Sequence, residues 1–252
     1  MKVLAIGNSF SDDASSYLHQ IAAAGGTQLD VVSLCIGGCP LQLHWENALS
    51  AQKVYGALVN GRETEGLVSL PETLENGGFD AVTLQQGSIL SGKADTYYPY
   101  IENLFHYVRA MSPGAEILVH QTWAYEDGYE RLSEYSNSSE TMFVRLEAAY
   151  ALAAERLGAL NGAPVRVIPC GAAMRAARRN PVFTSVCGDG NPYSLYRDGF
   201  HAGLVYGRYL LGAVWYETLT GKSILPNGFA PAGAEADKIA LLKECAHKAA
   251  RG

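Results

Sequence analysis

The stretch Val-Leu-Ala-Ile-Gly-Asn-Ser-Phe-Ser-Asp-Asp at residues 3–13 carries the strongest fold signal in the chain. Its first five residues are apolar or small, and they predict a buried strand over Val3–Gly7. Polar residues follow at once, and a helical stretch begins near Ala14. A strand that runs directly into a helix is typical of the β–α–β unit, in which successive strands pair in parallel.

Working outward from this stretch, short apolar runs alternate with longer runs of helical periodicity. The alternation predicts an α/β fold, a parallel sheet covered by helices on both faces. We find no internal repeat or low-complexity linker, and therefore expect one domain over residues 1–252. The further strands are expected at Leu29–Leu34, Phe79–Gln85, Glu116–Gln121 and Val165–Pro169, and the clearest helices at Tyr97–Met111, Thr141–Leu157 and Leu204–Leu219.

Two connections are longer than packing requires, Pro40–Gly78 and Glu126–Glu140. Both are rich in polar residues and turn formers, so we expect long loops there. Long loops at the carboxyl edge of a parallel sheet commonly shape binding sites, although a surface insertion without function is an equal alternative.

Composition excludes several classes of protein. Hydrophobic residues make up 48% of the 252 residues and charged residues 17%, which suits one packed core. The formal charge of -6 argues against binding to nucleic acid, which requires clustered Lys and Arg. The five cysteines form no CxxC pair, so no structural zinc site is expected. The first apolar run is too short for a signal peptide or a membrane span, which favours a cytoplasmic protein without a membrane partner.

Ser9 follows the first strand directly and precedes a helix. A serine in this position lies at the carboxyl edge of the sheet, near backbone N–H groups that favour developing negative charge. This is a suitable place for a nucleophile. The alternative is that Ser9 or Ser11 merely caps the helix, a common use of serine.

A second candidate element lies far along the chain, at Arg-Asp-Gly-Phe-His over residues 197–201, just before a predicted helix. Asp198 and His201 are three residues apart with a glycine between them, so the carboxylate can accept a hydrogen bond from one imidazole nitrogen. The other nitrogen is then free to face a serine, as in a Ser-His-Asp triad. A capping or packing role for His201 is the alternative.

Together, the Gly-Asn-Ser-Phe-Ser block and the Asp-Gly-Phe-His block resemble the SGNH, or GDSL-like, hydrolase superfamily. The resemblance implies a three-layer flavodoxin-like fold with a five-stranded parallel sheet of order 2-1-3-4-5. It also implies that Ser9 is the nucleophile and that Asp198 and His201 supply the acid and the base.

Two further blocks match this family less closely. Cys-Ile-Gly-Gly-Cys at residues 35–39 resembles the family's glycine block, so the resemblance places an oxyanion-hole N–H on Gly38, with Gly37 as the competitor, beside the N–H of Ser9. Where the family carries GxND, this chain has Gln-Gln-Gly-Ser at residues 85–88. Because glutamine keeps the amide donor, Gln86 is the expected replacement in what is then an atypical branch, and Gln85 or Ser88 is the alternative.

Other residues are expected to form the walls of the site. Trp45 follows the glycine block, and His120, Trp123 and Tyr125 close the fourth strand. With Gln85, these are the predicted substrate-binding residues, because aromatic faces can stack on a sugar ring or an acyl group. Packing in the core is the alternative. His120 has no aspartate nearby in sequence, so it is expected to support the site instead of acting as the base.

These features predict a serine esterase or deacetylase that cleaves a small acyl ester, on a carbohydrate or another polar carrier. No metal or organic cofactor is expected, because a triad with oxyanion donors activates a serine without one. The alternatives are an acyltransferase that uses the same acyl-enzyme, and a carbohydrate-binding protein that keeps the fold without turnover.

Overall fold

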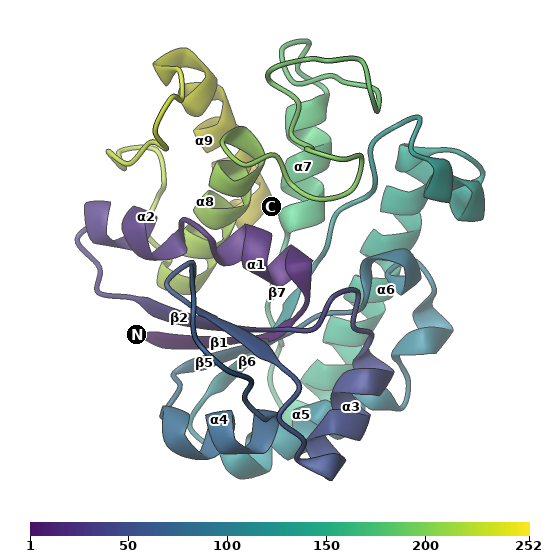
Figure 1. Cartoon of the computed structure of the whole chain (residues 1–252), viewed down its shortest axis with the longest axis vertical. Coiled ribbons are helices and arrows are strands. Elements are labelled where there is room, and N and C mark those ends of the chain that lie inside the picture. The colour runs from purple at the N-terminus through teal and green to yellow at the C-terminus, as the bar shows by residue number, and fades with distance from the viewer.

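A seven-stranded sheet runs through the centre of the computed structural model, which describes all 252 residues (Figure 1). Its order is β4-β3-β2-β1-β5-β6-β7. The strands are β1 (Lys2–Gly7), β2 (Asp30–Cys35), β3 (Gly56–Val59), β4 (Arg62–Glu63), β5 (Ala81–Leu84), β6 (Glu116–His120) and β7 (Val167–Ile168). The five predicted strands are β2-β1-β5-β6-β7 and pair in parallel, so the predicted 2-1-3-4-5 order is confirmed.

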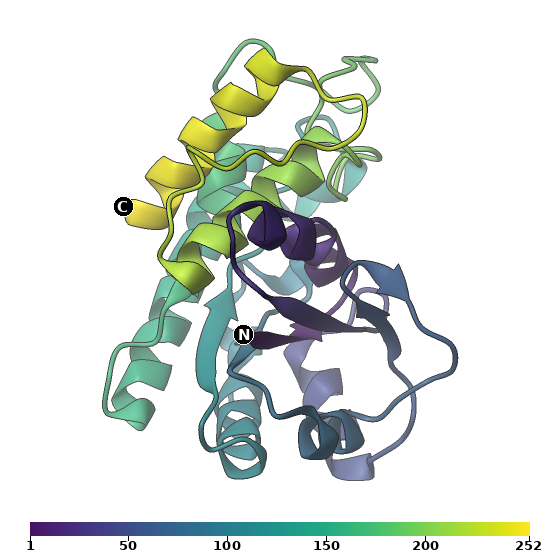
Figure 2. The same ribbon diagram turned by 90° about the vertical axis from the view of Figure 1, so that its left-hand side faces the viewer.

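Helices cover both faces of the sheet, which gives the three layers that the sequence predicts (Figures 1 and 2). One layer holds α1 (Ser9–Ser15), α2 (Leu18–Ala24), α7 (Cys170–Arg178), α8 (Tyr206–Thr220) and α9 (Ala236–Arg251). The other holds α3 (Leu41–Ser50), α4 (Leu70–Gly77), α5 (Tyr100–Met111) and α6 (Ser139–Asn161). Short 3-10 helices are η1 (Ser88–Leu90), η2 (Ala94–Tyr97) and η3 (Glu130–Tyr135). No helix is both long and apolar enough to cross a lipid bilayer.

The prediction of a long loop over Pro40–Gly78 is wrong. That segment contains α3 and α4, and also the hairpin β3–β4, which extends the sheet antiparallel to β2. The hairpin turn is Asn60-Gly61, whose φ angles of 53° and 77° fit a two-residue type I′ turn. Asn-Gly between two short strands was the sequence signal for this hairpin, but β4 is only two residues long and shows no alternating pattern.

The strand β1 occupies the middle of the sheet. Val3, Leu4, Ala5 and Ile6 are all at most 1% exposed, because helices cover the strand on both faces. The strand beside it on one side is β2, and on the other side β5, so the chain leaves β1 and β5 towards opposite edges. Such a switch point opens a crevice at the carboxyl ends of the strands, and Ser9 lies there.

Candidate active site

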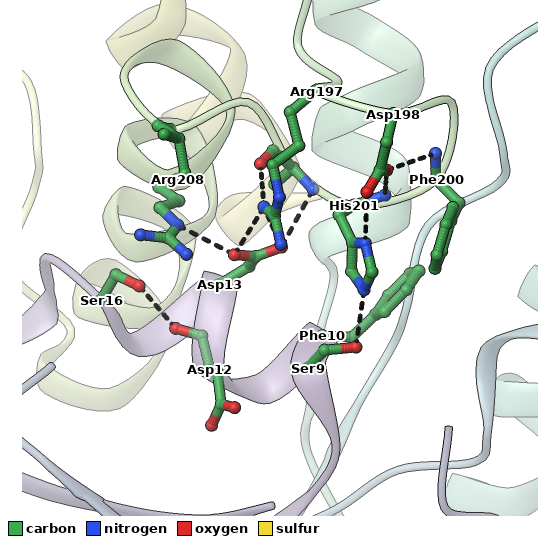
Figure 3. Close-up of polar contacts among 12 residues, drawn as sticks. Ser9, Phe10, Asp12, Asp13, Ser16, Arg197, Asp198, Phe200, His201 and Arg208 are labelled. Atoms are coloured by element: carbon green, nitrogen blue, oxygen red, sulfur yellow. Dashed lines mark hydrogen bonds and ion pairs between the residues drawn. The ribbon is translucent and has the colours of Figure 1, made fainter. Parts of the chain in front are cut away.

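The structure brings Ser9, His201 and Asp198 into one hydrogen-bonded row (Figure 3). Nε2 of His201 is 2.9 Å from Oγ of Ser9, and Nδ1 of His201 is 2.7 Å from Oδ2 of Asp198. If Nδ1 carries the proton and donates it to Asp198, Nε2 presents its lone pair to the serine hydroxyl. His201 can therefore accept the proton of the Ser9 hydroxyl. Ser9 and Asp198, at the two ends of the row, lie about 190 positions apart in sequence.

The turn that carries Asp198 and His201 is fixed by local hydrogen bonds. The backbone N–H groups of Phe200 and His201 donate to Oδ1 of Asp198, at 3.3 and 2.8 Å. Gly199, between Asp198 and Phe200, has a φ of 86°, a conformation that favours glycine. Burial raises the pKa of the Asp198 carboxyl, but the hydrogen bonds from the His201 ring and from these N–H groups outweigh it and lower the pKa overall. Asp198 is therefore ionised when it orients the imidazole.

Ser9 is the first residue of α1, and Asn8 caps that helix. Oδ1 of Asn8 accepts a hydrogen bond from the N–H of Phe10 at 3.0 Å. The N–H of Ser9 donates to no other group of the protein, as expected at the first position of a helix. It is available to a ligand beside the Ser9 hydroxyl.

The predicted glycine block forms a tight turn next to Asn8. The N–H of Cys39 donates to the carbonyl of Ile36 at 3.1 Å, and Gly38 has a φ of 64°. The side-chain amide of Asn8 donates to the carbonyl of Cys39 at 3.2 Å, so one buried residue ties the turn to the serine. Gly37 and Gly38 are exposed residues whose N–H groups make no hydrogen bond within the protein, so either N–H could donate to an oxyanion.

The expectation that the Gln86 side chain donates to an oxyanion is not met. Gln86 is fully buried, and its amide nitrogen donates to the backbone and side-chain oxygens of Thr96, at 3.0 and 3.1 Å. Its amide oxygen accepts from the N–H groups of Leu41 and Gly87, at 3.0 and 2.8 Å. Gln86 thus fastens the end of β5 to the start of α3. Ser88 is the one member of the alternative set that is partly exposed.

Gln85 and His120, two of the predicted substrate-binding residues, are also fully buried and belong to a hydrogen-bond network beneath Ser9. Oε1 of Gln85 accepts from Ser11 Oγ at 2.5 Å and lies 2.9 Å from Nδ1 of His120. Nε2 of Gln85 donates to Oδ1 of Asn8 at 2.8 Å. Burial lowers the pKa of His120 to about 3, so its ring is neutral. Because both residues are fully buried, neither can touch a substrate; Gln85 holds Asn8, and His120 holds Gln85.

The prediction that aromatic side chains form the walls of the site is also wrong for Trp45, Trp123 and Tyr125. Trp123 and Tyr125 are fully buried, because neighbouring aromatic rings cover them. The indole N–H of Trp123 donates to the carbonyl of Phe200 at 2.8 Å, so Trp123 supports the Asp198–His201 turn. Trp45 is only partly buried, but its ring packs edge-on against Tyr107 of α5 and takes no part in the contacts around Ser9.

Sequence reasoning missed Phe200, a partly exposed aromatic residue that packs against His201. Phe200 lies 3.8 Å from the His201 ring between centroids, and Tyr129 stacks on Phe200 at 5.3 Å. Phe200 stands inside the Asp-Gly-Phe-His block, so its proximity to His201 could have been read from the sequence. Tyr129 comes from the loop after β6, where the sequence offers several tyrosines as aromatic surfaces, and the structure shows that Tyr129 stacks on Phe200.

The bridge made by Asn8 gives a direct test of this geometry. Replacing Asn8→Ser keeps an oxygen that can cap α1 but is too short to reach Cys39, so the glycine turn loses its tie to the serine. We expect kcat for ester hydrolysis to fall by about 100-fold, because a small misplacement of oxyanion donors is costly, and the melting temperature to fall as well, because the buried Asn8 also accepts from Gln85. Steady-state kinetics and thermal unfolding measure both quantities. Wild-type kcat in this variant would show that the bridge is not needed.

Comparison with known proteins agrees with this architecture. The model of a domain of unknown function, DUF4886, matches residues 2–249. A DUF4886 protein from Bacteroides uniformis is 30% identical in sequence, with a TM-score of 0.86 over 99% of this chain and 94% of that chain. The chain belongs to the DUF4886 family. No curated protein matches the chain.

More distant structures share the fold of this DUF4886 member. A proposed SGNH hydrolase from Slackia heliotrinireducens is 23% identical, with a TM-score of 0.58 over 87% of this chain and 98% of that chain. An acetyl xylan esterase is 12% identical, with a TM-score of 0.55 over 87% of this chain and 100% of that chain. At these identities the likeness concerns the fold alone, which is the SGNH-type α/β fold that the sequence blocks suggest.

Proposed function

We propose that this DUF4886 protein is a serine esterase that cleaves a small acyl ester through an acyl-enzyme. The observation that carries the proposal is the 2.9 Å contact between His201 Nε2 and Ser9 Oγ, with Asp198 on the far side of the ring. A serine, a base and an orienting carboxylate in reach of one another form the machinery of nucleophilic acyl transfer.

The steps follow from this geometry. Oγ of Ser9 attacks the ester carbonyl carbon while His201 Nε2 accepts the hydroxyl proton. The resulting oxyanion accepts hydrogen bonds from the free N–H groups of Ser9 and Gly38. When the tetrahedral intermediate collapses, the carbon–oxygen bond to the alcohol breaks and His201 returns the proton to it. Water then attacks the acyl-enzyme by the same route, which releases the carboxylic acid and restores Ser9.

In this proposal Ser88 supplies the third donor, in place of the family's asparagine and of Gln86. Ser88 stands at the start of η1, partly exposed, and Gly87 before it packs close to the glycine turn: a Cβ on Gly87 would meet the Gly38 carbonyl at 3.1 Å. The Ser88 hydroxyl lies 2.8 Å from the hydroxyl of Tyr125. When Tyr125 donates to Ser88 in this pair, the Ser88 hydroxyl keeps its own proton for the oxyanion.

The proposed substrate is a small acyl group on a polar carrier such as a sugar. Phe200 packs against His201 and Tyr129 stacks on Phe200, and both aromatic residues are partly exposed. Aromatic faces of this kind stack on sugar rings. The acetyl xylan esterase of the same fold supports this choice of substrate class. No cofactor or further partner is part of the proposal.

The test is covalent labelling with a fluorophosphonate, followed by peptide mapping and a panel of acetyl to octanoyl nitrophenyl esters and acetylated sugars. We expect a single adduct on Ser9 and the highest kcat/KM with acetyl esters. A wild-type protein that neither reacts with the probe nor turns over any ester would favour the alternative, a carbohydrate-binding protein. An adduct on another serine would refute the assignment of Ser9.

A further inference from the structure

The segment that carries Asp198 and His201 lacks regular structure. Between the end of α7 at Arg178 and the start of α8 at Tyr206, no helix or strand is present. The side chain of Asp198 is 41% exposed, so packing around this side chain does not hold it in place. To keep Nε2 of His201 2.9 Å from Oγ of Ser9, further contacts must hold this segment against α1.

Asp13 of α1 makes such contacts, as Figure 3 shows. Its carboxylate, 1% exposed, accepts from Nη1 of Arg197 at 2.8 and 2.9 Å and from the backbone N–H of Ala202 at 3.0 Å. It also accepts from Nε of Arg208 in the first turns of α8, at 2.8 Å. We call Asp13, Arg197 and Arg208 the carboxylate brace.

The carboxylate brace contacts both ends of the segment Asp198–His201, which we call the catalytic turn. Arg197 comes directly before Asp198, and Ala202 comes directly after His201. The N–H of Arg197 also donates to the carbonyl of His201 at 3.1 Å, which closes the turn. On the other side, Asp13 lies four residues after Ser9, one helical turn along α1. Asp13 therefore links the helix of the nucleophile to both ends of the turn that carries its base.

Opposite charges strengthen the link between Asp13 and the two arginines. A buried carboxylate needs charged partners, and the two guanidinium groups, each about 30% exposed, provide them. Hydrogen bonds between ionised partners are shorter and stronger than neutral ones. Removing the negative charge leaves two arginines facing each other, so the catalytic turn is expected to move away from α1.

We propose that Asp13 is a positioning residue, which holds His201 at hydrogen-bond distance from Ser9 through Arg197 and Ala202. The proposal rests on the proposed role of the Ser9–His201 pair. It assigns Asp13 no contact with the substrate. Its effect is on the rate of the step in which Ser9 attacks, because reacting groups misplaced by about 1 Å can cost a factor of about 100.

The test compares Asp13→Asn with Asp12→Asn. Asparagine has the shape of aspartate and keeps one oxygen for the N–H of Ala202, but lacks the charge that draws in the arginines. Asp12 is the matched control, because it is the next carboxylate on the same helix and accepts from Ser33 at 2.7 Å, away from the catalytic turn. Arg208→Gln is a milder variant that removes only one arm of the brace.

We expect Asp13→Asn to lower kcat per titrated active site by about 100-fold with KM nearly unchanged, and Arg208→Gln to lower it by about 10-fold. Asp12→Asn should stay within about 2-fold of wild type. Titration with the fluorophosphonate counts only folded sites, so a loss of stability alone leaves kcat per site unchanged. If Asp13→Asn and Arg208→Gln keep the wild-type kcat per site, the proposal is wrong.

A second readout does not depend on turnover. In NMR spectra of protein with labelled histidine, the ring signals of His201, assigned with His201→Gln, report its surroundings directly. We expect them to shift or broaden in Asp13→Asn and to stay in place in Asp12→Asn. Unchanged signals in Asp13→Asn would overturn the brace even if the protein hydrolyses no ester, whereas failed labelling of the wild type would overturn only the proposed function.

Discussion

Ser9→Ala and His201→Ala are each expected to lower kcat for ester hydrolysis by about 10⁴- to 10⁶-fold. Ser9 supplies the atom that bonds to the acyl carbon, and His201 is the only group in hydrogen-bond reach of its hydroxyl. Neither function has a substitute, because the buried His120 is held by Gln85 instead. Steady-state kinetics with an acetyl ester measure the loss.

The two residues act as a unit, so the double variant should be no slower than the slower single variant. Ser11→Ala is the matched control, because Ser11 stands in the same block and bonds to Gln85 instead of His201. We expect it to keep most of the turnover. Loss of activity in Ser11→Ala equal to that in Ser9→Ala would contradict the choice of nucleophile.

The second large expected effect is a steep loss of stability in acid, caused by two buried histidines. Burial lowers the pKa of His44 and of His120 to about 3, from an ordinary value of 6.5. Below pH 6.5 the unfolded chain therefore binds protons at both rings that the folded protein does not. The free energy of unfolding falls as the pH falls, by about 1.4 kcal/mol per pH unit for each ring.

Between pH 6 and pH 4 the two rings together are expected to lower the free energy of unfolding by about 5 kcal/mol. This loss is comparable with the whole stability of many domains. Urea unfolding monitored by tryptophan fluorescence over this range gives the slope. His44→Gln is the sharper test, because His44 bonds to Tyr55 and not to any residue of the Ser9, His201 and Asp198 row. It should reduce the slope by about 1.4 kcal/mol per pH unit. An unchanged slope would mean that His44 does not stay neutral in the folded protein.

The sequence by itself determined the layers of the fold and the two blocks that supply Ser9, Asp198 and His201. Strand β1 and the block around Ser9 are contiguous, so a buried run followed by a polar turn was visible without a structure. The same holds for Asp198 and His201, whose spacing around Gly199 already allows one side chain to orient the other. In each case the decisive contacts join residues only a few positions apart.

Only the tertiary structure decided which polar and aromatic residues face the crevice. Gln86 has the donor that an oxyanion needs, yet Thr96 and Leu41 take both ends of its amide. Trp123 has a face that could stack on a sugar, yet Phe10 covers it at 4.1 Å between ring centroids. Asp13 looked like an ordinary residue of a helix, and it links α1 to a turn 184 positions away. Periodicity and turn chemistry are local properties, whereas the partner of a buried polar group depends on which distant segments pack around it.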